Sequence, residues 1–163
     1  MDEFDRVPSE EILAGRRALE GVKNVSILED VRWFSSISNW VVNIQICIET
    51  HDADLVPACT EWFLAIPQSY PCGDIKIYPS KKNSITHVFH HQNYRERDDE
   101  VLPWIKRYIC VSTSVHGLGR VGYDVEPYDV YQRLRWHVER AKEWLIAASE
   151  GKLVEDVRTL TEN

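Results

Sequence analysis

A run of alternating apolar side chains, from Trp40 to Glu49, constrains the fold of this chain most strongly. In an extended strand, residues at every second position share one face and pack on a core. A second run with the same period extends from Asn24 to Phe34, and only Ser35 to Asn39 separate the two. Both runs predict strands that pair in antiparallel fashion across a short connection. In the second strand the residues of the shared face are Trp40, Val42, Ile44, Ile46 and Ile48.

Two further extended segments follow along the chain. Thr60 to Ile66 alternates and stops at Pro67, and Asp74 to Tyr78 stops at Pro79. Proline cannot donate a backbone hydrogen bond, so it favours the end or the edge of a strand. The connection between these segments, Gln68 to Gly73, is rich in turn-forming residues. Together the four segments predict a four-stranded antiparallel β-meander.

Helical patterns flank the predicted sheet. Ser9 is a suitable N-cap for a short N-terminal helix. A long helix is predicted from about Val130 to Glu150. Asp129 directly precedes it and lies three residues before Gln132, which is the spacing of a capping box. Trp136 points away from the apolar stripe of this helix, which indicates either partial burial under neighbouring chain or a partner surface. The stripe itself, typical of a helix packed on a sheet, contains Leu134, Val138, Ala141, Leu145 and Ala148, flanked by His137 and Trp144.

Length and composition fit a single domain over residues 1–163, and the strand and helix patterns make it an α+β domain. The net charge of −7 argues against general nucleic-acid binding and suits a basic protein partner better. Residues 1–30 are rich in charge and show no signal peptide, and no later run reaches membrane-spanning length, so a cytoplasmic protein is expected. The cysteines have no metal-binding or scaffold spacing and are expected to be free thiols: Cys47, Cys59, Cys72 and Cys110.

Two motifs have ordinary explanations beside the functional ones. Gly117 to Gly122 matches the G-x-G-x-x-G spacing of a dinucleotide site, but no helix follows directly, and a flexible loop fits the context better. His87 and His91 would share a face of a strand and could join a metal site, whereas hydrogen-bonded loop histidines are the default. We therefore expect neither a metal ion nor a cofactor.

Cys110 is the candidate nucleophile. It lies in a short apolar run, Tyr108 to Ser112, after a polar loop that contains His90, His91 and Asn93. A neighbouring imidazole, from His91 or His137, would lower the thiol pKa and make a Cys-His hydrolase. The alternative is a buried, unreactive cysteine that packs as a small apolar side chain. Spacing alone does not decide between these readings.

The order of these features resembles the ubiquitin-conjugating enzyme (UBC) fold. The resemblance is carried by Phe63 to Pro71, which ends in Tyr-Pro, by His91 to Asn93, and by Ile109-Cys110-Val111. It implies an N-terminal helix, a four-stranded antiparallel meander, an active-site loop with a catalytic cysteine, and a C-terminal helix. The segment Arg133 to Leu145 is similar to bacterial members of this fold from CBASS antiphage defence.

The resemblance implies acyl transfer through a thioester on Cys110. Asn93, or His90 or His91, would donate a hydrogen bond to the developing oxyanion; Gln92 stands where the family has proline, and Asn93 lies seventeen residues before the cysteine. Implied partners are the C-terminus of a cGAS-like nucleotidyltransferase or ubiquitin-like modifier, a ubiquitin-activating-like adenylyltransferase, and a target lysine. An inactive adaptor on the same fold is the alternative. Candidate substrate-binding residues are Ser112, Asp124 and Glu126.

Overall fold

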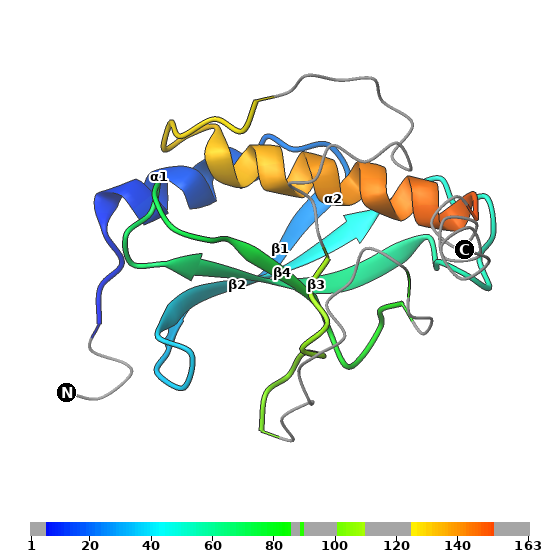
Figure 1. The fold of residues 1–163 in the computed structure, drawn as a ribbon, viewed down its shortest axis with the longest axis horizontal. Helices are drawn as coiled ribbons and strands as arrows, with labels where there is room; N and C mark the ends of the chain where they lie inside the picture. Colours follow the sequence, from blue (N-terminus) through cyan, green and yellow to red (C-terminus); the bar gives the residue numbers. More distant parts are fainter. Residues whose placement is uncertain (1–5, 86–88, 90–100, 110–124, 152–163) are drawn as a thin grey trace, which may run out of the picture.

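Four antiparallel strands form one sheet in the order β1-β2-β3-β4, and two helices lie across one of its faces (Figure 1). The computed structural model describes residues 6–85, 89, 101–109 and 125–151. This α+β arrangement is the predicted one, with the elements in the predicted order. Their bounds are α1 (Glu10–Leu19), β1 (Val25–Phe34), β2 (Asn39–Cys47), β3 (Cys59–Pro67), β4 (Lys76–Pro79) and α2 (Arg133–Ser149).

Strand register sets which side chains face the helices. β2 and β3 pair without interruption from Asn39 opposite Pro67 to Cys47 opposite Cys59. β1 pairs with β2 less regularly, with register shifts between Ile27 and Arg32. The predicted helix-facing set of β2 is confirmed, because its even-numbered residues from 40 to 46 all belong to the core between sheet and helices.

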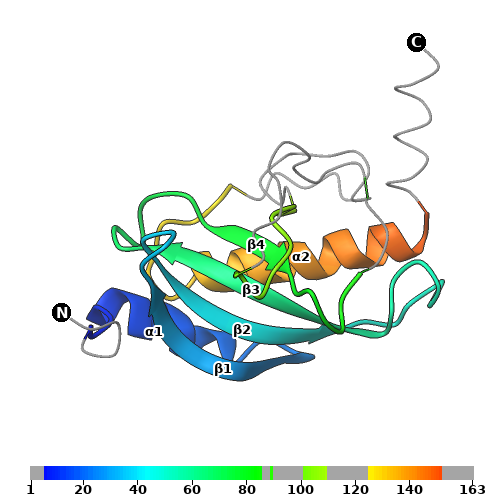
Figure 2. The ribbon, with the colours of Figure 1, turned by 90° about the horizontal axis from the view of Figure 1, so that it is seen from below.

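Buried side chains cover both faces of the sheet. The larger core lies between the sheet and the helices and includes the stripe of α2, all of whose predicted members are fully buried. Trp144 of α2 packs edge-on against Trp62 of β3 and against Phe89. A smaller core lies on the opposite, outer face and contains Phe63 and Tyr78. Figure 2, turned by 90°, shows the helices on one side of the four strands.

Residues 101–109, which we call the strap, cover part of the outer face. The strap appears yellow-green below the sheet in Figure 1. Backbone hydrogen bonds join it to β4 and the following residues, from Ile105 N–H to the Pro79 oxygen and from Lys81 N–H to the Pro103 oxygen. Trp104 of the strap is 1% exposed and stacks on Tyr78 at 5.4 Å between ring centroids. The strap is thus fixed to the sheet by both backbone and aromatic contacts.

α2 begins where several segments meet. Gln132 is its N-cap and makes no capping bond through its side chain. Asp129 accepts hydrogen bonds from the Tyr131 and Gln132 N–H groups through Oδ1, so it caps the turn before the helix. The first helical residue is therefore three positions later than predicted. Trp136 is half-buried, as the reading of partial burial predicts, and the Arg140 guanidinium lies 5.0 Å from its ring centroid.

Two further local predictions are wrong. β4 starts at Lys76 rather than Asp74, because pairing with β3 begins at Ala65 opposite Lys76. Cys47 and Cys59 are joined by a disulfide rather than free. The register of β2 and β3 places these two cysteines directly opposite each other, with 4.1 Å between their Cα atoms. Cys72 is free, as predicted, and it is exposed. No helix in the described part of the chain is long and apolar enough to cross a membrane.

Candidate functional site

The predicted site residues divide into two groups. Glu126 lies within the described residues, and so do the residues that immediately precede His90 and Cys110. The remaining candidates lie outside the described residues: His90, His91, Asn93, Cys110, Ser112 and Asp124. The structure describes the residues that directly precede two of these candidates, Phe89 before His90 and Ile109 before Cys110.

Ile109 fixes the end of the strap directly before Cys110. Its side chain is buried in the core between sheet and helices, and its N–H donates a hydrogen bond of 3.1 Å to the Ile77 oxygen of β4. The preceding ring, Tyr108, packs edge-on against Tyr78 and lies under the Lys76 ammonium, 4.9 Å from the ring centroid. Ile109, the residue directly before Cys110, is therefore a fixed point at the edge of β4 that the strap covers.

Phe89 provides a second fixed point, directly before His90. It is fully buried, and its ring centroid lies 5.4 Å from that of Trp144 in α2. Phe89 and Ile109 belong to the same core. The residues directly before His90 and directly before Cys110 are therefore anchored in the same buried core.

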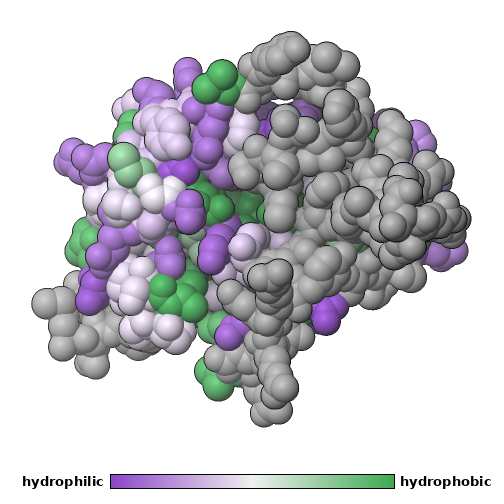
Figure 3. All heavy atoms as spheres, viewed as in Figure 1, coloured by the Kyte–Doolittle hydropathy of each residue, from purple (hydrophilic) through white to green (hydrophobic). Residues whose placement is uncertain are grey.

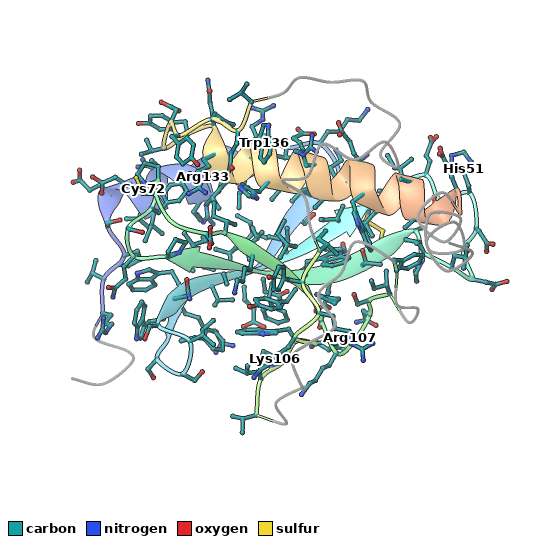
Figure 4. All side chains as sticks on the ribbon, viewed as in Figure 1. His51, Cys72, Lys106, Arg107, Arg133 and Trp136 are labelled. Carbon is teal, nitrogen blue, oxygen red and sulfur yellow. A yellow bond between two sulfur atoms is a disulfide. The ribbon has the colours of Figure 1, made fainter. Side chains whose placement is uncertain are left out.

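A buried arginine at the start of α2 links three segments. Arg133 is 3% exposed; its Nε donates to Glu126 Oε1 at 2.9 Å and its Nη1 donates to the Pro71 oxygen. Its guanidinium also lies over the ring of Tyr128. Figure 4 shows Arg133 at the N-terminal end of α2 with Cys72 nearby. The arginine thus ties the turn after β3, through Pro71, to the chain that enters α2.

His137 shares the carboxylate of Glu126. Its Nε2 lies 2.6 Å from Glu126 Oε1. Desolvation alone would raise the pKa of Glu126, but the hydrogen bonds from His137 and Arg133 outweigh it and lower that pKa. Burial lowers the pKa of His137, with further lowering by Arg133 and Arg140, despite the opposing effect of Glu126. An ionised Glu126 accepting from a neutral Nε2–H follows from these directions.

The sequence singled out Glu126 for contact with substrate, and the structure adds a local role. One carboxylate oxygen already accepts two hydrogen bonds, so Glu126 holds the entry to α2 in place. Sequence reasoning overlooked Arg133. Arg133 and His137 are four residues apart and so lie on one face of the helix, a spacing from which a shared partner could have been predicted. Within the described residues, no group of three or more His, Cys, Asp or Glu side chains could hold a metal ion.

The exterior around α1 and α2 is mainly polar. Figure 3 shows that hydrophobic residues visible from this side form small, separate patches among hydrophilic ones. The N-terminal helix, the four antiparallel strands and the C-terminal helix, in this order, make up a UBC-like α+β fold. The fold implied by the sequence is thereby confirmed.

Comparison with known proteins agrees with this class. Over 119 residues, 73% of the chain, it is 26% identical to the ATP-dependent ubiquitin transferase-like protein Cap2 of Enterobacter hormaechei subsp. hoffmannii (strain UCI 50). The match spans 20% of the length of that protein. No family model matches the chain. The similarity to Cap2 bears out the resemblance to bacterial ubiquitin-conjugating-like proteins that was inferred from the sequence.

Proposed function

We propose that this domain is a ubiquitin-conjugating-like acyl carrier of CBASS antiphage defence. In this proposal Cys110 accepts the C-terminal carbonyl of a protein as a thioester and passes it to an amine, such as a lysine of a target. The carried protein is a cGAS-like nucleotidyltransferase or a ubiquitin-like modifier. A ubiquitin-activating-like adenylyltransferase supplies the activated C-terminus.

One observation carries the proposal: the similarity to a ubiquitin transferase-like protein covers 73% of a chain that has the UBC-like order of elements. The framework supports it. Ile109 is anchored to β4 directly before Cys110, and Phe89 is anchored to α2 directly before His90. A nucleophile that directly follows an anchored residue has less conformational freedom to lose when it reaches the acyl group.

The proposed reaction consists of two acyl-transfer steps at the same carbonyl carbon. The Cys110 thiolate attacks the carbonyl carbon of the activated C-terminus, and the previous leaving group departs. The amine then attacks the same carbon, loses a proton to solvent or a nearby base, and the Cys110 thiolate leaves. Both steps place negative charge on the carbonyl oxygen. A donor such as Asn93, His90 or His91 would stabilise that charge, and loss of one such donor typically costs about 100-fold or more in rate.

The decisive test is adduct formation on a non-reducing gel. The protein is incubated with ATP, an activating enzyme and a candidate modifier. We expect an adduct that thiol reagents remove and that Cys110→Ala abolishes. Cys110→Ser should instead give an adduct that resists thiols and yields to alkali, because an oxygen ester replaces the thioester.

Cys72→Ala is the matched control, since Cys72 is the exposed free cysteine among the described residues. It should leave the adduct unchanged. If the wild-type protein forms no adduct with an activating enzyme that is competent on another carrier, the transfer proposal fails. An adduct that persists in Cys110→Ala would move the site to another cysteine.

In the alternative of a Cys-His hydrolase, His137 is a poorer candidate for the base than His91. His137 is 4% exposed, and its Nε2 is already bound to Glu126. A histidine that is buried and bonded in this way orients the helix rather than offering a free base. An inactive adaptor remains the other outcome of the gel experiment.

A further inference from the structure

The disulfide between Cys47 and Cys59 lies at the surface, where the two inner strands of the sheet end. Cys47 is the last residue of β2, and Cys59 is the first residue of β3. Cys59 is exposed, and Cys47 is half-buried. Alternation along the strands places both side chains on the outer face with Val41 and Phe63, away from the helices. A thiol in solution therefore reaches Cys59 more readily than Cys47.

The disulfide closes a connection, residues 48–58, that contacts the C-terminal end of α2. The His51 N–H donates to Ser149 Oγ at 3.3 Å, and His51 Nε2 lies 3.3 Å from Glu150 Oε1. Val56 is fully buried in the core between sheet and helices. Figure 4 shows the labelled His51 beside the end of α2. The connection is thus held both by the disulfide and by contacts with the helix.

The backbone on either side of the cysteine pair is held independently of the disulfide. Cys47 N–H donates to the Asn24 oxygen at 2.9 Å, and Ile48 N–H donates to the Ala58 oxygen at 2.7 Å. These bonds keep the two sulfurs close to each other after the S–S bond is broken. Reduction would then be reversible, because two thiols held side by side re-form a disulfide far more readily than two thiols free in solution.

We propose that Cys59 is a site of thiol–disulfide exchange with a small thiol, and that exchange there loosens the hold of residues 48–58 on α2. The thiolate attacks Cys59 Sγ and forms a mixed disulfide, and Cys47 leaves as a thiolate that takes up a proton. A second thiol then attacks the sulfur of the first, which releases the small-molecule disulfide and leaves Cys59 as a thiol. The protein disulfide is reduced by two electrons, and the two small thiols are oxidised. This goes beyond the acyl-carrier proposal, because it does not involve Cys110.

The position of the disulfide favours exchange over a purely structural role. Exposed disulfides are the ones that small thiols reduce, whereas structural disulfides resist the glutathione pool. A cross-link that closes only residues 48–58 also restrains the unfolded chain less than one that closes a long loop. Residues 51–54 are all exposed, so few buried contacts oppose opening of the connection.

The first measurement is the redox equilibrium of the folded, full chain. The protein is equilibrated in glutathione buffers of increasing reduced-to-oxidised ratio, quenched with acid, alkylated and analysed by mass spectrometry. Digestion at acidic residues separates the two cysteines, because Glu49, Asp52 and Asp54 lie between them. We expect the disulfide to open without denaturant within the ratios that cells maintain, and glutathione to appear on Cys59 rather than on Cys47.

The second measurement is amide hydrogen exchange of the oxidised and the reduced protein. Reduction should speed exchange in residues 48–58 by about tenfold or more, because local opening of the connection then meets less resistance. Exchange in α1, at the other end of the molecule in Figure 1, should change less than about twofold.

Three variants locate the effect. Cys47→Ala with Cys59→Ala should exchange like the reduced wild type in both buffers. Cys72→Ala, which removes an exposed free thiol, should keep the full difference between the two states. Ser149→Ala removes the bond to the His51 N–H and keeps the disulfide, so it should speed exchange in the connection without changing the redox equilibrium. Circular dichroism melts identify any variant that is unfolded.

Two results would overturn the exchange site. One is a disulfide that stays oxidised, or cysteines that stay reduced, at every glutathione ratio in the folded protein. The other is glutathione on Cys47 in preference to Cys59. Equal exchange of residues 48–58 in the oxidised and reduced wild type would overturn the effect on the connection. Failure of the gel test of Cys110 leaves all of these measurements intact.

Discussion

The N-cap residue of α2, Gln132, makes no capping hydrogen bond through its side chain, and the hydroxyl of Tyr70 takes over that role. Tyr70 donates a hydrogen bond to the Val130 oxygen at 2.7 Å and accepts one from Leu134 N–H at 3.2 Å. The first N–H groups of a helix have no partner inside it, and Gln132 offers none from its side chain. Burial raises the pKa of Tyr70, so the phenol stays protonated and able to donate. The Tyr-Pro turn thus orients the long helix.

We predict that Tyr70→Phe lowers the free energy of unfolding by about 1–3 kcal/mol, because it removes the hydrogen-bonding partner of a partly buried carbonyl and of a buried helix N–H. Urea denaturation measures this. Tyr131→Phe, at a position that is 59% exposed, is the matched control and should change stability by less than about 0.5 kcal/mol. Equal stability of the two variants would show that the hydroxyl does not cap α2.

The pair of Glu126 and His137 makes stability depend on pH. The pKa values of both groups are lower in the folded state than their ordinary values. Each group then binds a proton more readily in the unfolded chain, so its contribution is complete above its unfolded pKa and is lost on acidification. The loss starts below about pH 6.5 for His137 and below about pH 4.5 for Glu126.

Melting temperature should therefore fall between pH 7 and pH 5, and His137→Gln should show a shallower fall over this range. The measurement is thermal unfolding by circular dichroism at each pH. Tyr131→Phe is a suitable control, since Tyr131 is 59% exposed and the substitution removes no group that titrates in this range, so it should keep the wild-type slope. A His137→Gln slope equal to that of wild type would contradict the linkage.

α1 and α2 pack so closely that their contact leaves no room for a side chain at Gly15. A Cβ on Gly15 of α1 would lie 2.8 Å from the Tyr70 hydroxyl and 2.9 Å from Leu134 Cδ1. Both groups are buried, and the hydroxyl is held by two hydrogen bonds, so neither moves away freely. α1, the Tyr70 turn and α2 therefore form one packed unit.

We predict that Gly15→Ala destabilises the protein by about 1–2 kcal/mol, even though alanine favours a helix by about 1 kcal/mol over glycine. Gly21→Ala is the matched control, because a Cβ there would have its nearest contact at 3.6 Å. It should be neutral or slightly stabilising. Chemical denaturation compares the two, and a stabilised Gly15→Ala protein would refute the close packing.

Much of the element layout was predictable because it follows from local patterns. The alternation in β2 identified its core face, and the stripe of α2 identified its buried residues. Prolines correctly marked the ends of β3 and β4. These signals depend on period and turn chemistry alone, which a sequence displays directly.

The remaining features depend on contacts between distant residues. The start of β4 depends on which residue of β3 opposes it, and the disulfide depends on the register of two strands. The role of Arg133 depends on Pro71 and Glu126, which approach it only in the fold. The assignment of Cys110, Asn93, His90 and His91 stays a prediction, and the structure contributes their anchored neighbours.

For the molecule as a whole, the disulfide closes the connection between β2 and β3. We predict that the unfolded, unreduced protein takes up two alkyl groups per chain by mass spectrometry, on Cys72 and Cys110, and four after reduction. Reduction should also lower the melting temperature, since closing a loop of this size contributes about 2–4 kcal/mol. Uptake of four alkyl groups without reductant would contradict the disulfide and support the four free thiols that the sequence predicts.

The segments on either side of residues 110–124 are both anchored in the folded core, which bears on what a cut in the chain between them would do. Ile109 is bonded to β4, and Glu126 is bonded to Arg133 of α2, so both ends of this stretch are held by the folded core. A single peptide-bond cleavage within it would yield an N-terminal fragment with the sheet and a C-terminal fragment with α2. Because Trp144 and Leu145 complete the shared core, the fragments would stay associated as a non-covalent complex, and the domain would tolerate a break in its chain beside its own candidate nucleophile.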